Sequence, residues 1–328
     1  MMDRRNFARL AAAGVFGASL AAAAQPAGKV WRIGFLNGGA RPPDGAPPVA
    51  LRKALQTLGY TEGKDIVYEV RSGEVRNERL QGFATDLVAL KVDAIVTVGG
   101  PSAAAAKHAS IFTPVVVVHA GDVVETGLVA SLARPGGNVT GVNDPAAVLS
   151  SKRLEMLKEM VPAMKQAAVL WNLNDQAMTL RFQAFERAAQ LLRVAIVPLG
   201  VREPDDFNTA LAAMGRAPPD ALMMVSDSLT TQNRQRVIDY AAAQRIPAMY
   251  EFAGAVRAGG LMSYGSDAAE DFKLAADYVH RILKGARPGE LPVEQPNRYF
   301  LVINLKTAKA LGLVVPQSVL LRADEVIQ

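Results

Sequence analysis

Short apolar runs alternate with longer amphipathic stretches along most of the chain. Residues 30–36 (VWRIGFL) form an apolar run that ends at a polar, glycine-containing turn, which is typical of a strand and its following loop. Residues 49–58 then space their apolar side chains three and four positions apart and are followed by a glycine, which predicts a helix. The four consecutive valines at 115–118 predict a strand that is buried on both faces.

The alternation falls into two series, which predicts two parallel sheets with helices on both faces. A single eight-stranded barrel is the rival architecture for a chain of this length. The C-terminal part argues against a barrel, because a long helix at 268–284 and a proline-rich connector interrupt the regular alternation of strands and helices. The other strands are predicted at 66–70, 94–98, 139–142, 167–171, 195–199, 221–225, 248–250, 261–264 and 299–304, and the other helices at 78–90, 102–109, 151–160, 177–192, 207–214 and 231–244.

The beginning of the chain has the organisation of an export signal. Two arginines are followed by an apolar stretch at 10–24 that ends in an Ala-x-Ala cleavage site, and this stretch is shorter than the ~20 residues that span a bilayer. Residues 3–9 (DRRNFAR) are similar to a twin-arginine motif, although Asp3 and Ala8 depart from it. We therefore expect residues 1–24 to be a twin-arginine-like signal peptide, with a general secretory signal as the alternative, and the mature protein to be periplasmic.

Composition removes several classes of site. The chain has no cysteine, which excludes disulfides, thiolate metal sites and cysteine nucleophiles. Its histidines, His108, His119 and His280, have no metal-binding spacing, so neither a metal nor another cofactor is expected. The net charge is +5, and it falls to +3 without residues 1–24, which carry three arginines and one aspartate. No basic run is interleaved with aromatic residues, so no nucleic-acid partner is expected.

Several blocks of sequence resemble the exported solute-binding proteins of ABC transporters, in the group that contains tryptophan- and phenylalanine-type binders. The resemblance extends from about residue 30 to the C-terminus. It is carried by residues 114–122 (PVVVVHAGD), 127–142 (GLVASLARPGGNVTGV), 259–265 (GGLMSYG), 275–285 (AADYVHRILKG) and 301–312 (LVINLKTAKALG).

This resemblance implies a class I periplasmic binding-protein fold, an α/β architecture. Two Rossmann-like lobes with parallel sheets would be joined by a three-crossing hinge and would face one another across a cleft. The crossings are expected near residues 142–143, 264–267 and 292–295. The implied first lobe is 30–142 plus 266–293, and the implied second lobe is 143–265 plus 294–328.

Ligand contacts in such sheets come from the loops at the carboxyl ends of the strands, where helix N-termini carry unpaired N–H groups. In the first lobe, these loops offer six candidate residues. Ser102 could also serve as a helix cap, and His119 could be a packed core histidine. The candidates are Asn37, Gly38, Gly100, Ser102, His119 and Asp122.

The second lobe and the crossings offer Asn143, Asn172, Asp227, Tyr250 and Tyr264. Asp227 could bind an amine or hydroxyl, or cap the next helix, and the tyrosines could form an aromatic wall or pack in the core. If Asp122 and Asp227 are ligand contacts, changing either to alanine weakens binding and spares the fold. Arg41 and Arg202 are the basic residues nearest to the predicted cleft loops, where either could pair with a carboxylate or stay at the surface.

The resemblance implies the solute-binding component of an ABC importer, a monomer that delivers an amino-acid-like, aromatic or carboxylate compound to an ABC permease with a separate ATPase subunit. The loop at 37–43 lacks the histidine that aromatic amino-acid binders carry there, so neither tryptophan nor phenylalanine is assumed. One alternative is a sensor that presents its solute to a receptor. The other is an exported α/β enzyme, against which the missing Gly-x-Ser-x-Gly and Gly-x-Gly-x-x-Gly motifs argue.

Overall fold

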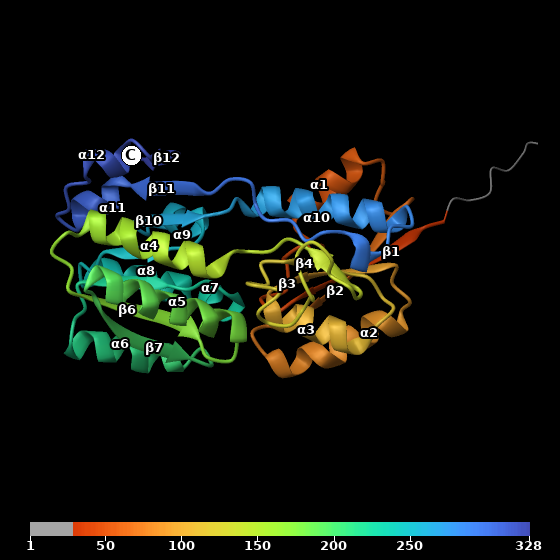
Figure 1. Ribbon diagram of the computed structural model, residues 1–328, viewed down its shortest axis with the longest axis horizontal. Helices are drawn as coiled ribbons and strands as arrows, with labels where there is room; N and C mark the ends of the chain where they lie inside the picture. The colour runs from red at the N-terminus through yellow and green to blue at the C-terminus, as the bar shows by residue number, and fades with distance from the viewer. Residues whose placement is uncertain (1–28) are drawn as a thin grey trace, which may run out of the picture.

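Two α/β lobes lie side by side in the computed structural model, which describes residues 29–328 (Figure 1). Each lobe has its own sheet, with hydrophobic clusters on both faces of that sheet. The predicted signal peptide, residues 1–24, falls outside the described residues. The two-lobed α/β architecture is thus confirmed, and the single barrel is excluded.

The sheet of the first lobe has five strands, all parallel, in the order β2-β1-β3-β4-β5. The four valines of β4 have no exposed surface, as their sequence predicted, because helices cover both faces. The strands are β1 (Trp31–Asn37), β2 (Ile66–Ser72), β3 (Ala94–Val98), β4 (Val115–Val118) and β5 (Val139–Gly141).

Helix α10 (Ala268–Leu283) covers one face of this first sheet although it lies late in the sequence (Figure 1). Its apolar residues recur every three or four positions, and the buried ones, such as Phe272 and Val279, pack with Ile33 and Val116 of the sheet. The other helices of the first lobe are α1 (Val49–Thr57), the 3₁₀ turn η1 (Asn77–Arg79), α2 (Leu80–Ala89) and α3 (Gly100–Ala109).

The sheet of the second lobe has seven strands in the order β12-β11-β10-β9-β8-β6-β7. All neighbours are parallel except β10 and β11. The strands are β6 (Gln166–Asn172), β7 (Ala195–Val201), β8 (Ala221–Met224), β9 (Ala248–Tyr250), β10 (Met262–Gly265), β11 (Phe300–Asn304) and β12 (Glu325–Ile327).

Two of the predicted helices of the second lobe differ from the observed ones, and the short helices at 253–257, 305–310 and 317–320 were not predicted. The helix predicted at 151–160 begins earlier, at Ala146. The helix predicted at 231–244 is two helices that meet at Asn233, whose side-chain amide donates to the Leu229 carbonyl. Within residues 29–328, no helix is long and apolar enough to cross a membrane. The helices are α4 (Ala146–Met160), α5 (Gln176–Leu192), α6 (Asp206–Arg216), α7 (Ser228–Gln232), α8 (Arg234–Ala243), α9 (Ala253–Arg257), α11 (Leu305–Ala310) and α12 (Gln317–Leu320), and a 3₁₀ turn η2 (Pro288–Glu290) precedes β11.

The chain passes between the lobes three times: between β5 and α4, between β10 and α10, and between α10 and β11. Two of these crossings lie side by side, because Val142 pairs with Glu294 and the Asn143 N–H donates to the Glu294 carbonyl at 2.8 Å. The connections are short, and the first and third are hydrogen-bonded to each other, so they can act as a hinge that keeps the two lobes facing each other.

Candidate ligand-binding site

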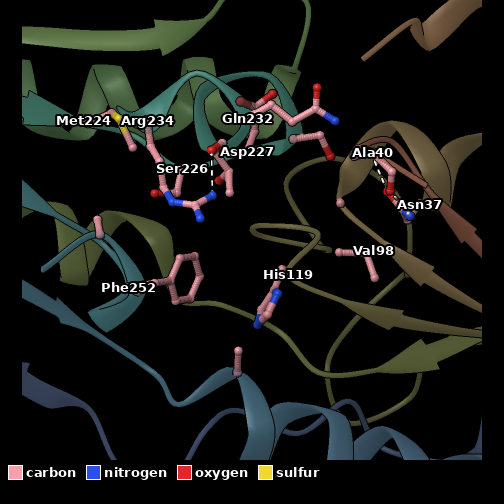
Figure 2. Close-up of a pocket in the computed structure, with 17 residues that line it drawn as sticks. Asn37, Ala40, Val98, His119, Met224, Ser226, Asp227, Gln232, Arg234 and Phe252 are labelled. Carbon is pink, nitrogen blue, oxygen red and sulfur yellow. Dashed lines mark hydrogen bonds between the residues drawn. The ribbon is translucent and has the colours of Figure 1, made fainter. Parts of the chain in front are cut away.

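A cavity of about 490 Å³ lies between the lobes, at the carboxyl ends of strands from both sheets (Figure 2). This volume is within the range of small-molecule sites in proteins. The first lobe supplies Asn37, Gly39, Ala40, Val98, Gly99, His119 and Ala268, and the second lobe supplies Met224, Ser226, Asp227, Ser228, Thr231, Gln232, Arg234, Phe252, Gly254 and Ala255.

His119 is held in a defined orientation on the first-lobe side of the cavity. Its backbone has a φ of +53°, which is uncommon for a residue with a side chain, and its Nε2 lies 2.8 Å from Oδ2 of the buried Asp271. Asp271 also accepts a hydrogen bond from the Ser266 hydroxyl. With Nε2 engaged in this way, Nδ1 is the ring nitrogen available to a molecule in the cavity.

An aromatic wall spans the two lobes. The ring of Phe252, from the second lobe, lies 5.1 Å from the ring of His119 and is tilted by 49° to it. Figure 2 shows Phe252 and Arg234 facing His119 across the cavity. An aromatic or other flat group in the cavity can therefore contact a ring from each lobe.

Arg234 is the basic residue of the second-lobe wall. It begins α8, directly after the break at Asn233, and its Nη1 donates to the Thr231 carbonyl at 2.9 Å. No carboxylate of residues 29–328 forms an ion pair with it. Its remaining N–H groups are therefore available to a ligand carboxylate.

Asp227 supplies a carboxylate on the same wall and also caps α7. Its Oδ1 accepts from the Thr230 N–H at 2.9 Å, and its Oδ2 accepts from the Asn172 amide at 2.5 Å. Both of the functions considered for Asp227, cavity lining and helix capping, are therefore present in one residue. Asn172 does not line the cavity, but it fixes the orientation of this carboxylate.

Three glycines of the first lobe lie against the second lobe, and at Gly38 and Gly121 there is little or no room for a side chain. A Cβ atom on Gly38 would lie 3.0 Å from the Ser228 hydroxyl, and one on Gly121 would lie 2.5 Å from the Cβ of Ala177. A Cβ on Gly100 would lie 3.4 Å from a carboxylate oxygen of Asp175. The structure therefore shows the lobes closed on one another.

A smaller cavity of about 20 Å³ forms the deep end of the same cleft and shares Val98, His119 and Asp227 with the larger one. Ser102 and Asp175 also line it. Ser102 is completely buried, and its hydroxyl has no hydrogen-bond partner within residues 29–328. Burial, and then the negative charge of Asp227, raise the pKa of Asp175 to about 7.

A buried network of four charged residues lies beneath the second-lobe wall. Glu251, one residue before Phe252, accepts from Arg153 at 2.8 Å and from Arg181 at 2.5 Å. Arg181 also donates to Asp144, next to the first crossing, and Glu251 accepts from the backbone N–H of Ser226. Although burial alone would raise the pKa of Asp144, the two arginines lower it. The network therefore joins two cavity loops to the hinge.

The structure brings together six of the residues singled out in the sequence. Asn37, His119 and Asp227 line the large cavity, Gly38 and Ser102 line its deep end, and Gly100 approaches Asp175. The others lie elsewhere. Asp122 accepts from the backbone N–H groups of Val124 and Glu125, Asn143 accepts from Val123, and Tyr264 contributes its carbonyl to Arg153.

Tyr250 corrects one expectation. It is 1% exposed and packs in a hydrophobic cluster of the second lobe, where burial raises its pKa. The aromatic residue of the cavity is Phe252, just beyond the end of β9. The physical reason is position, because Tyr250 is still within the strand and its ring packs into the core.

Sequence reasoning missed Arg234 and considered Arg41 and Arg202 instead, neither of which lines the cavity. A continuous helix over 231–244 would have placed Arg234 on an ordinary surface. The signal that could have found it is the polar run TTQN at 230–233, in which Asn233 is a poor residue for a helix interior.

The arrangement is suited to binding a small molecule. It combines a basic group, a carboxylate, a ring pair and several hydroxyl and amide groups around one cavity. Within residues 29–328, no group of three or more histidine, aspartate or glutamate side chains could hold a metal ion.

Comparisons with known proteins agree with this geometry. The family model described as "ABC transporter substrate binding protein" matches residues 49–327. A tyrosine-binding protein of Clostridioides difficile strain R20291 is 29% identical over 262 residues, which cover 80% of this chain and 75% of that protein.

Solved structures show the same architecture. A conserved domain protein of Vibrio cholerae has a TM-score of 0.84 at 26% identity, and a Streptococcus pneumoniae ABC domain in complex with L-Trp has 0.83 at 24% identity. A ligand-free, open substrate binding protein of Clostridium difficile has 0.65 at 25% identity. Each comparison covers 91% of this chain and 100% of the other.

Proposed function

Because this chain belongs to the ABC transporter substrate-binding protein family, we propose that it is the exported solute receptor of an ABC importer. In this role it captures a small organic molecule between its lobes in the periplasm and delivers it to a membrane permease that is driven by a separate ATPase subunit. The chain binds its solute and does not transform it.

The observation that supports this proposal is the cavity whose walls come from both lobes. A ligand that contacts His119 and Phe252 together can do so only when the lobes are closed. Such a ligand shifts the equilibrium toward the closed form by its difference in affinity for the two forms. A permease can then distinguish the loaded receptor by its shape.

The side chains of the cavity favour an aromatic compound that carries a carboxylate. Phe252 and His119 provide the ring contacts, and the guanidinium of Arg234 provides the partner for the carboxylate. The relatives named as a tyrosine-binding protein and as a complex with L-Trp agree with such a ligand. The loop after β1 supplies no histidine to the cavity. The cavity has a histidine nevertheless, because the loop after β4 supplies His119.

The proposal is tested by melting the purified protein with L-tyrosine, L-tryptophan, L-phenylalanine and a panel of other amino acids and aromatic acids. A ligand at a hundred times its dissociation constant stabilises the folded state by about 2.7 kcal/mol, which raises the melting temperature by several degrees. Each stabilising compound is then incubated with the protein and recovered. Recovery unchanged supports a receptor, whereas conversion of the compound overturns it.

Replacing Arg234 by glutamine should weaken the binding of a carboxylate ligand about 10- to 100-fold, because a hydrogen bond to a charged group contributes about 1.5–3 kcal/mol. Isothermal titration measures this loss. Arg202→Gln is the matched control, since Arg202 is an exposed arginine of the same lobe that does not line the cavity. Equal affinities for the Arg234→Gln variant and its parent would contradict the assigned role.

A further inference from the structure

Two carboxylates lie close together at the buried, deep end of the cleft. Asp175 and Asp227 both line the 20 Å³ cavity, and burial and then the negative charge of Asp227 raise the pKa of Asp175. The charged and titratable groups that face Asp175 are Asp227 before α7, Arg181 on α5 and His119 from the first lobe. Arg181 already forms ion pairs with Asp144 and Glu251, so it leaves this negative charge largely unbalanced.

The neighbouring Ser102 is a second, independent sign of a missing ligand group. Its hydroxyl is fully buried at this cavity and has no hydrogen-bond partner within the described chain. Buried polar groups are nearly always hydrogen-bonded, because leaving one unsatisfied costs about 1–3 kcal/mol. A group bound in the small cavity could supply the partner.

The dimensions of the small cavity limit what that group can be. A volume of about 20 Å³ holds one water-sized group. The small cavity shares His119, Asp227 and Ser228 with the large one, so one molecule can extend through both. An ammonium group has the required size, donates three hydrogen bonds and neutralises a carboxylate.

We propose that Asp175, Asp227 and Ser102 form a subsite for a cationic nitrogen, so that the solute is a primary amine whose carboxylate and ring lie in the larger cavity. The assignment rests on the proposed binding function and narrows it to zwitterionic compounds. Asp175 and Asp227 come from the second lobe and Ser102 from the first, so the ammonium group itself helps to hold the lobes together.

The burial of Asp175 should make ligand binding depend on pH. With the lobes closed as in this structure, its pKa is raised to about 7, so part of the population carries a proton near neutral pH. A bound ammonium group favours the ionised carboxylate and lowers that pKa again, so binding releases the proton. Affinity is therefore greatest above pH 7, and it falls about tenfold per pH unit once the pH is well below 7.

The test compares L-tyrosine and L-tryptophan with 3-(4-hydroxyphenyl)propanoate and 3-(indol-3-yl)propanoate, which lack only the amine. Isothermal titration at pH 8 should give affinities at least 100-fold weaker for the desamino acids. Titration at pH 6.5 in two buffers of different ionisation enthalpy should show that protons are released when the amino acid binds, as expected for a carboxyl group of pKa about 7.

Asp175→Asn and Asp227→Asn should each weaken amino-acid binding at least 30-fold and reduce the preference for the amine. Asparagine is also a good helix N-cap, so α5 and α7 keep their caps and the fold is spared. Proton release should disappear in Asp175→Asn. Asp122→Asn, the same chemical change in a loop turn away from the cavities, should alter neither quantity.

The possible failures are distinguishable. Equal affinity for amino and desamino acids overturns the amine subsite and leaves the binding function standing. Binding of none of the four compounds overturns the aromatic ligand class. The ligand that the melting screen identifies then tests the amine subsite. If that ligand has no cationic nitrogen, the subsite is overturned.

Discussion

Replacing Gly121 by leucine should reduce ligand affinity by at least 100-fold by preventing closure. Gly121 has a φ of +77°, and even a Cβ atom there would lie 2.5 Å from the Cβ of Ala177 in the other lobe. A larger side chain cannot enter this contact, so the lobes stay apart and the ligand keeps contacts with one lobe only. Small-angle X-ray scattering should give the same radius of gyration with and without a saturating ligand, whereas the parent protein becomes more compact.

Gly127→Leu separates obstruction from backbone strain. Gly127 has a φ of +71°, so leucine is disfavoured there to a similar degree, yet nothing lies within 4 Å of where its Cβ would be. This variant should lose stability as Gly121→Leu does and still close on its ligand. An equal loss of affinity in both variants would show that strain, and not the contact between the lobes, causes the effect.

Replacing Glu251 by glutamine should destabilise the protein by about 3–5 kcal/mol. Glu251 is 1% exposed and accepts from two arginines that are themselves buried, and its neutral form leaves both with too little compensating charge. Urea denaturation monitored by circular dichroism measures the loss. The backbone N–H of Ser226 also depends on this carboxylate, so ligand binding should weaken in the same variant.

Glu325→Gln is the matched control for this effect. Glu325 also pairs with an arginine, Arg257, at 2.6 Å, but both side chains are exposed to solvent, by 40% and 61%. Ion pairs of that kind contribute about 0–1 kcal/mol, so the change should be small. If Glu251→Gln cost no more than Glu325→Gln, the buried network would not be a stabilising element of the second lobe.

The sequence predicted the layers of the fold well because their signal is local. Four valines at 115–118 predict a buried strand without knowledge of their neighbours, and the spacing of apolar residues in 268–283 predicts an amphipathic helix. Which sheet that helix covers is not local information. Its assignment to the first lobe came from the family resemblance, and the antiparallel pairing of β10 with β11 was not predicted.

The candidate site was predictable where it follows strand ends and unpredictable where it depends on tertiary packing. Asn37, His119 and Asp227 each come directly after an apolar run, within one to three residues of it, so the topology alone brings them to the cleft. Arg234 reaches the cavity because the chain breaks at Asn233 and α8 starts anew. The importance of Asp175 depends on the approach of the other lobe, which no pattern in its own segment reveals.

Helix α10 has a consequence for how the molecule is made. The core of the first lobe contains Phe272, Ala275 and Tyr278 of this helix, so a nascent chain that ends before Ala268 leaves one apolar face of its first sheet uncovered. The ribosome has by then already delivered β6 to β10 of the other lobe. Neither lobe is encoded by one continuous stretch of the gene, so exchanging a lobe between relatives requires a cut at each of the three crossings.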